Sequence, residues 1–178
     1  MTAVVRAAQA STPFAFRAQT LTSLTVLLAV TGMRVGEALR LDCCDVDWDQ
    51  AILKVRDTKF GKGRDVVVSA STIDALATYR SRRDSTRPAT ARLFASLTGT
   101  PVVYGNFAHT FHQAVLTAGV GAEGLTRPRV HDLRHAFAVR TLLGWYRAGL
   151  DVEALLPRLS TYLGHQEPRF TYQYLTAT

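Results

Sequence analysis

The segment from Phe14 to Val30 limits the fold of this 178-residue chain more than any other part of it. Apolar side chains recur there three and four residues apart and widen into a broad stripe, formed by Leu21, Leu24, Val26, Leu27, Leu28 and Val30. A helix that is apolar on most sides is stable only when other elements surround it. We therefore expect a central, buried helix in one well-packed domain, which the chain is long enough to form. No apolar run reaches the roughly eighteen residues of a membrane span, so no membrane contact is expected.

Further helical patterns follow along the rest of the chain. We expect helices over 34–41, from an N-cap at Ser71 to about Arg83, over 104–118, from about 130 to 149, and over 170–175. The segment after Asp151 leaves two alternatives: one helix capped by Asp151, or a shorter helix with Pro157 in its first turn. In both cases Gly164 is expected to end the helix.

Two segments have the composition of strands, residues 51–57 and residues 64–69. The turn between them, residues 58–63, contains glycine, so the pair predicts a β-hairpin. Residues 93–97 are expected to add a short third strand, whereas the aspartate-rich segment 42–49 is expected to be loop and turn. The predicted fold class is α+β: mainly helical, with one small antiparallel sheet.

The basic residues favour a polyanionic partner. The net charge is +7 and the pI is about 9.9. Only Lys54, Lys59 and Lys62 are lysines, and the other basic residues are arginines, whose planar guanidinium binds phosphate with two hydrogen bonds. Cys43 and Cys44 are adjacent and lie outside any metal-binding spacing, as expected for reduced thiols of a cytoplasmic protein.

The motif His131-Asp132-Leu133-Arg134 is a candidate anion site. His131 and Arg134 are three residues apart at a helix start, so they share one face, and the positive end of the helix attracts anions. One residue supplies a proton donor or acceptor and the other a fixed charge. The alternative is an ordinary surface pair on an amphipathic helix.

Arg34 follows the Thr31-Gly32-Met33 turn and stands at a helix start, where the helix dipole disfavours a cation. Such a conflict with local preference indicates a functional role. Glu37, one turn later, could orient the Arg34 guanidinium or hold the turn. The alternative is an i,i+3 ion pair worth only about 0.2–0.5 kcal/mol.

Three further candidates follow in the sequence. Lys59 lies at the expected hairpin tip, with Lys62 as a rival and a solvated basic turn including Arg64 as the alternative. His165 follows the helix-ending Gly164, and Tyr174 lies nine residues further on. A chain reversal near Pro168 would bring these two rings into one pocket. Tyr172 is the rival of Tyr174, and a packed aromatic is the alternative role.

The combined order of these residues resembles the catalytic domain of the tyrosine recombinases, the phage-integrase family. The resemblance covers about residues 14–178 and rests on TGMRVGEALRL at 31–41, HDLRH with the following AFA at 131–138, and LGH at 163–165 with a tyrosine nine residues later. It implies an integrase-like catalytic domain over 14–178, after a linker or disordered start over 1–13. The N-terminal DNA-binding domain that is usual in the family is expected to be absent.

The resemblance also implies roles for the candidates. The expected activity is site-specific cleavage and rejoining of double-stranded DNA through a 3′-phosphotyrosine, with assembly into a tetramer on DNA and with no metal or cofactor. Tyr174 would be the nucleophile, His131 its proton acceptor and Lys59 the general acid for the leaving 5′ oxygen. The phosphate would be held by Arg34, Arg134 and His165, and Glu37 would support Arg34.

Three other functions remain open at this point. A type IB topoisomerase would share the chemistry but relax supercoils without exchanging partners. A DNA-binding domain could keep the scaffold without catalysis, although the complete residue set disfavours this. A helical interaction domain with coincidental motifs is the third alternative.

Overall fold

The computed structural model describes residues 3, 6–7, 15–56, 63–86, 90–120, 127–165, 169–172 and 174. Among its described helices, none is both long and apolar enough to cross a membrane. The division of the chain between residues 13 and 14 stays a prediction, although Ala7 is buried against the core.

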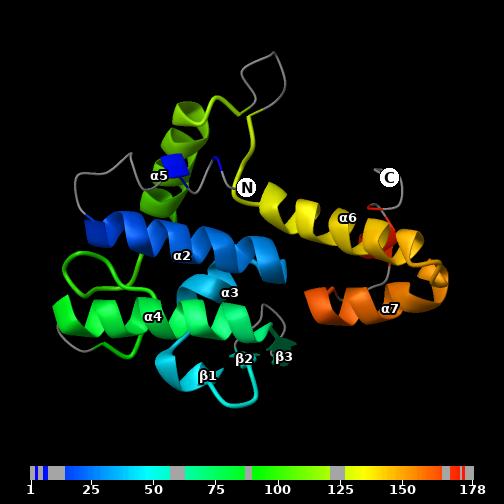
Figure 1. The fold of residues 1–178 in the computed structure, drawn as a ribbon, viewed down its shortest axis with the longest axis horizontal. Helices are drawn as coiled ribbons and strands as arrows, with labels where there is room; N and C mark the ends of the chain where they lie inside the picture. Colours follow the sequence, from blue (N-terminus) through cyan, green and yellow to red (C-terminus); the bar gives the residue numbers. More distant parts are fainter. Residues whose placement is uncertain are drawn as a thin grey trace.

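Helix α2, Ala15–Thr31, is the central element, as its apolar pattern predicts. Leu24, Leu27 and Leu28 are almost completely buried. Figure 1 shows α2 beside α4, with α5 at one end of α2 and α6 at the other, and α2 contacts all three. Because α2 packs against these neighbours, it fixes the distance between the start of α3 and the helices of the second half.

The other expected helices are present with small differences at their ends. They are α3 at Val35–Arg40, α4 at Ala70–Thr86, α5 at Tyr104–Thr117, α6 at Asp132–Arg147 and the short α8 at Arg169–Tyr172. The predicted Ser71 cap of α4 is wrong. Ser69 Oγ accepts from Thr72 N at 3.3 Å, so the helix begins two residues earlier. The cap lies where strand β3 has just ended, and a serine there satisfies a free N–H of the first turn.

Helix α7, Val152–Leu163, follows the first of the two alternatives. Asp151 Oδ1 accepts from Ala154 N at 3.0 Å, so Asp151 is the N-cap. Pro157 lies inside the helix, and a helix starting at Pro157 is therefore wrong. Burial of Val152, Leu156, Leu159 and Leu163 along one face offsets the hydrogen bond that the proline lacks. Gly164 ends the helix with φ +70°, as predicted.

The sheet contains β1 at Val46–Asp47, β2 at Ile52–Val55 and β3 at Arg64–Val67, in that order and antiparallel. The register pairs Leu53 with Val46 and with Val66. The predicted pairing of the two longer strands is confirmed. Residue 57, the end of the first expected strand, and residues 58–62 of the expected turn lie outside the described residues. The expected third strand at 93–97 is wrong. Its consecutive residues Leu93, Phe94 and Ala95 are all buried, so the segment enters the core and forms only isolated bridges.

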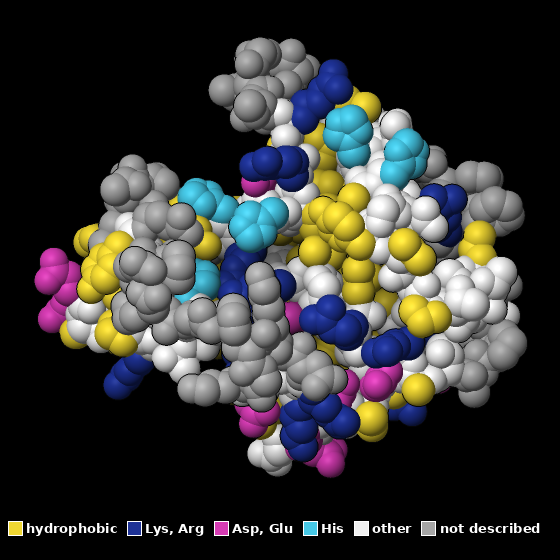
Figure 2. Space-filling model, turned by 180° about the vertical axis from the view of Figure 1, so that it is seen from behind, with side chains coloured by type: hydrophobic (Ala, Val, Ile, Leu, Met, Phe, Trp, Pro, Cys, Tyr) yellow, Lys and Arg dark blue, Asp and Glu magenta, His cyan; other side chains and the backbone are white. Residues whose placement is uncertain are grey.

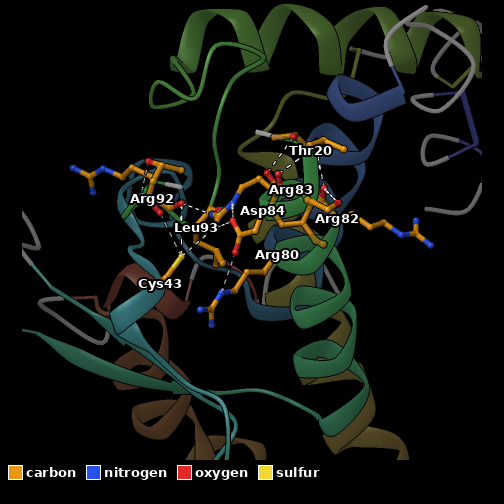
Figure 3. A network of polar contacts seen from close by, with 12 residues as sticks. Thr20, Cys43, Arg80, Arg82, Arg83, Asp84, Arg92 and Leu93 are labelled. Atoms are coloured by element: carbon orange, nitrogen blue, oxygen red, sulfur yellow. Dashed lines mark hydrogen bonds and ion pairs between the residues drawn. The ribbon is translucent and has the colours of Figure 1, made fainter. Parts of the chain in front are cut away.

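A buried arginine holds that segment in place. Arg83 of α4 donates to Leu93 O at 2.7 Å and to Arg92 O, and its Nε donates to Asp84 Oδ1 at 2.8 Å. In Figure 3 the Arg83 side chain points into this group of acceptors, and its Nη2 also donates to Cys43 Sγ at 3.4 Å. These contacts compensate for burying a charge. They lie apart from a second cluster of buried apolar side chains, which belong mainly to α6 and α7.

The Gly32 turn gives a direct test of this packing. Gly32 has φ +62°, and a Cβ there would lie 2.4 Å from Phe137 Cδ1, whereas Gly99 has φ +80° with open space around it. We expect Gly32→Ala to reduce the free energy of unfolding by about 2–5 kcal/mol, and Gly99→Ala by only about 1 kcal/mol, because the second change adds backbone strain without overlap. Urea denaturation measures both values. Equal losses would show that the contact with Phe137 is unimportant.

Candidate active site

Arg34 is the N-cap residue of α3, and Glu37 holds it there. Arg34 N donates to Glu37 Oε2 at 2.9 Å, and Arg34 Nη1 donates to Glu37 Oε1 at 3.1 Å. The Glu37 side chain is 2% exposed, whereas the Arg34 side chain is 43% exposed. Glu37 therefore both closes the turn and orients a guanidinium that stays open to solvent.

Glu37 is also bound by a second arginine. Arg64, the first residue of β3, donates from Nη1 to Glu37 Oε1 at 2.9 Å and from Nη2 to Glu37 Oε2 at 2.8 Å. Burial alone would raise the pKa of Glu37, but the hydrogen bonds and charge of Arg64, together with those of Arg34, lower it below its ordinary value. The carboxylate is thus ionised between two guanidinium groups.

Arg134, in the first turn of α6, is buried next to Arg34. It donates from Nη1 to Gly32 O at 2.8 Å and from Nη2 to Leu163 O at 2.9 Å. Burial first, and then the charge of Arg34, lower the pKa of Arg134 to about 10, while Tyr174 and Glu37 act in the opposite direction. Arg134 is still a cation at neutral pH, and it lies beside Arg34, because the two side chains bind the consecutive carbonyls of Leu163 and Gly164.

The end of α7 binds three arginines in succession. The carbonyls of Tyr162, Leu163 and Gly164 accept from Arg64 Nε at 2.8 Å, Arg134 Nη2 at 2.9 Å and Arg34 Nη2 at 3.0 Å. The last carbonyls of a helix lack partners within the helix and carry partial negative charge, which favours cations there. Gly164 is required, because a Cβ at this position would lie 2.8 Å from Arg64 Nη1.

Two histidines lie at the same site. His131 is the N-cap residue of α6, and His165 directly follows Gly164, with its Nδ1 2.8 Å from Thr171 Oγ1. Burial, followed by the charge of Arg134, lowers the pKa of His131. Burial, followed by Arg134, Arg34 and Arg64, lowers the pKa of His165 to about 4. Both rings are therefore neutral at pH 7, and each has one N–H donor and one acceptor nitrogen.

Tyr174 packs between two imidazoles. Its ring centroid lies 5.1 Å from that of His135, edge to face, and 6.2 Å from that of His165, stacked. Tyr174 is only 3% exposed and joins the core of α6 and α7, whereas Tyr172 is 51% exposed. The structure thus places Tyr174, rather than its rival Tyr172, against His165 and near Arg134.

The structure therefore brings together six of the seven sequence-predicted residues: Arg34, Glu37, His131, Arg134, His165 and Tyr174. Lys59 and its rival Lys62 lie outside the described residues. Figure 2 shows histidine side chains next to a group of Lys and Arg side chains near the middle of one face. The arrangement can bind an anion at two guanidinium groups and can exchange protons through neutral imidazoles.

Sequence reasoning missed two residues at this site. The sequence offers Arg64 only as part of a solvated basic turn, yet its side chain is 11% exposed and donates three hydrogen bonds, two to Glu37 and one to Tyr162 O. His135 contacts the Tyr174 ring from the position one turn after His131. The His135 contact could be inferred from helical spacing in HDLRH, but no local signal indicates the partners of Arg64. Within the described part of the chain, no three His, Cys, Asp or Glu side chains group as metal ligands.

Comparison with known proteins identifies the family to which the chain belongs. The chain belongs to the phage integrase family, whose model matches residues 3–178. This confirms the resemblance seen in the motifs, and the α+β fold class is confirmed by solved recombinases. The chain has a TM-score of 0.76 to the XerA recombinase, with 26% identity over 97% of this chain and 55% of that one. The TM-score is also 0.76 to the XerH site-specific recombinase bound to difH substrate, with 22% identity over 97% and 47% of the two chains.

Two relatives are similar in sequence. A putative integrase/recombinase, y4rB of Sinorhizobium fredii, is 45% identical over 158 residues, which are 85% of this chain and 50% of the relative. The tyrosine recombinase XerD of Mycobacterium tuberculosis is 33% identical over 156 residues, covering 85% of this chain and 46% of the relative. The chain thus spans about half the length of the curated relatives it matches.

The lowered pKa of His165 predicts a pH dependence of stability. As the pH falls below 6.5, an unfolded chain binds the proton first, so stability that is present above pH 6.5 is lost progressively down to about pH 4. The lowered pKa of His131 also makes the folded chain less stable as the pH falls. We expect His165→Gln to flatten this decline, measured by urea denaturation at several pH values between 4 and 7. His109→Gln, on the surface of α5, is the control. An unchanged slope in His165→Gln would contradict the prediction.

Proposed function

We propose that this chain is the catalytic part of a site-specific recombinase that cleaves and rejoins DNA through a 3′-phosphotyrosine. The observation that carries the proposal is the convergence of Arg34, Arg134, His165 and Tyr174, which come from three distant parts of the sequence: the start of α3, the start of α6 and the segment after α7. Membership of the phage integrase family supports the same activity.

The first step is attack by the Tyr174 phenol oxygen on the phosphorus of one phosphodiester. An O–P bond to Tyr174 forms, the bond from phosphorus to the 5′ oxygen breaks, and the 5′ oxygen leaves with its electron pair. A phenol is a weak nucleophile at neutral pH, so its proton passes to a base, which we assign to neutral His131. Lys59 protonates the leaving 5′ oxygen. The reverse attack by a 5′ hydroxyl rejoins the strand without an external energy source.

Two arginines stabilise the charge that develops on the non-bridging oxygens. Arg34 is exposed enough to meet phosphate, and Arg134 is fixed by Gly32 O and Leu163 O. Charge-assisted hydrogen bonds from preorganised donors act most strongly where water is excluded. His165 adds a donor through Nε2 in the neutral tautomer whose Nδ1 accepts from the Thr171 hydroxyl.

The proposed partner is double-stranded DNA. The net charge of +7 favours a polyanion, and the related XerH structure contains its difH substrate. The proposal includes assembly of the whole protein into a tetramer on DNA. It also includes a cytoplasmic location, which the free thiols of Cys43 and Cys44 support.

Replacement of the nucleophile gives the sharpest test. We expect Tyr174→Phe to abolish covalent protein–DNA adducts on a nicked substrate taken from the flanks of the encoding element, because the attacking oxygen is removed while the ring still packs against His135. DNA affinity should change little. The matched control is Tyr172→Phe, which should form adducts like the unmodified chain.

Gel analysis of trapped adducts gives the result directly. Adducts in Tyr174→Phe, or their loss only in Tyr172→Phe, would refute the assignment. Relaxation of a supercoiled plasmid without a specific site would instead favour the topoisomerase alternative.

A second test concerns the arginines. We expect Arg34→Ala and Arg134→Ala each to slow single-turnover cleavage by about 10²-fold or more, the usual effect of losing one preorganised oxyanion donor. Arg140→Ala is the control, since Arg140 lies on α6 but donates to Ala29 O instead. Cleavage at near-normal rates in both site variants would exclude the two-arginine clamp.

A further inference from the structure

We propose that Arg64 is a positioning residue of the cleavage reaction, which sets the place of Arg34 through Glu37 and the place of His165 through the end of α7. The inference rests on the proposed function and extends the site by a residue outside its catalytic set. Arg64 itself acts on protein groups rather than on DNA.

The contacts of Arg64 are all internal. Its Nη1 and Nη2 bind the two oxygens of Glu37 at 2.9 and 2.8 Å, and its Nε binds Tyr162 O at 2.8 Å. The side chain is 11% exposed, compared with 43% for Arg34. A guanidinium with two parallel bonds to one carboxylate has a fixed orientation, which a lysine does not reproduce.

The first route of action runs through Glu37. This carboxylate accepts four hydrogen bonds, two from Arg34 and two from Arg64. Without Arg64 it would lose half of them and keep its charge in a buried place, so the carboxylate would shift toward solvent or toward Arg34. Either shift moves the guanidinium of Arg34 from the position that Glu37 and Gly164 O now define.

The second route runs through the end of α7. Tyr162 O, bound by Arg64, is the first of three consecutive carbonyls, and the next two bind Arg134 and Arg34. His165 follows immediately, with its N donating to Ser160 O at 3.0 Å. A displacement at Tyr162 is therefore passed to both phosphate-binding arginines and to His165. Arg64 links the sheet to all three.

Comparison with the buried Arg83 separates positioning from stability. Arg83 also binds backbone carbonyls and a carboxylate, and its side chain is 2% exposed, but its network belongs to α4 and the 92–93 segment (Figure 3). Replacing either arginine by lysine keeps the charge and loses the forked geometry. Arg64→Lys and Arg83→Lys are therefore matched variants, one at a half-buried and one at a buried site.

The experiment measures single-turnover adduct formation at saturating DNA, DNA affinity and melting temperature. We expect Arg64→Lys to slow adduct formation by about 10-fold or more, since small displacements in a preorganised site reduce rates strongly. DNA affinity should stay within about 3-fold, because Arg64 makes no phosphate contact in this account. Arg83→Lys should lower the melting temperature and leave the rate within about 2-fold, as expected for a change remote from the site.

Two further measurements show how Arg64 acts on the reaction. Glu37→Gln should slow adduct formation as Arg64→Lys does, and the double variant should be no slower than the slower single variant, because the two residues act as one unit. A substrate with sulfur in place of the leaving 5′ oxygen needs little protonation, since a thiol is far more acidic than an alcohol. We expect Arg64→Lys to form adducts more slowly than the unmodified chain with this sulfur substrate as well.

The possible failures are distinguishable. If the unmodified chain forms no adduct, the proposed function fails and takes this inference with it. If the unmodified chain reacts but Arg64→Lys reacts equally fast, or Arg83→Lys slows as much at the same loss of melting temperature, only the positioning role is refuted. Additive effects in the double variant, or full recovery with the sulfur substrate, refute it as well.

Discussion

The hydrogen bonds between the last carbonyls of α7 and three arginines are the contacts on which the site depends. A helix end leaves carbonyls without intrahelical partners, and here Tyr162, Leu163 and Gly164 direct theirs to Arg64, Arg134 and Arg34. Those arginines belong to β3, α6 and the start of α3, so one helix end gathers the sheet and both halves of the helical domain. The left-handed conformation and missing side chain of Gly164 permit this approach.

The electrostatics of the site favour an anion. Two guanidinium groups, those of Arg34 and Arg64, share one buried carboxylate, Glu37, while Arg134 binds the carbonyls of Gly32 and Leu163. The repulsion among these cations contributes to the lowered pKa values of Arg134 and His165. Burial contributes still more to both shifts. A phosphate between Arg34 and Arg134 would offset the excess positive charge and bring negative charge next to Tyr174. The same field keeps His131 and His165 neutral, the state in which one can accept a proton and the other donate a hydrogen bond.

The sequence predicts most of the fold and most of the candidate residues that the structure brings together, because their signals are local. The apolar spacing of 21–28 predicted α2, the Asp151 cap and Gly164 bounded α7, and helical spacing placed His131 and Arg134 on one face. The two-residue β1 is too short to show a strand pattern, and 93–97 resembles a strand because its first three residues, 93–95, are all apolar and buried. The role of Arg64 depends on partners 27 and 98 residues away, which no spacing rule encodes.

We propose that Arg34, Arg134 and Tyr174 act on the same phosphorus atom. A crystal structure of Tyr174→Phe bound to a DNA duplex from the flanks of the encoding element tests it most directly. We predict one phosphate with its two non-bridging oxygens bound by Arg34 and Arg134, and the edge of the replaced ring facing its phosphorus opposite the 5′ oxygen. Guanidinium groups bound to different phosphates, or a ring at position 174 remote from both, would contradict the claim.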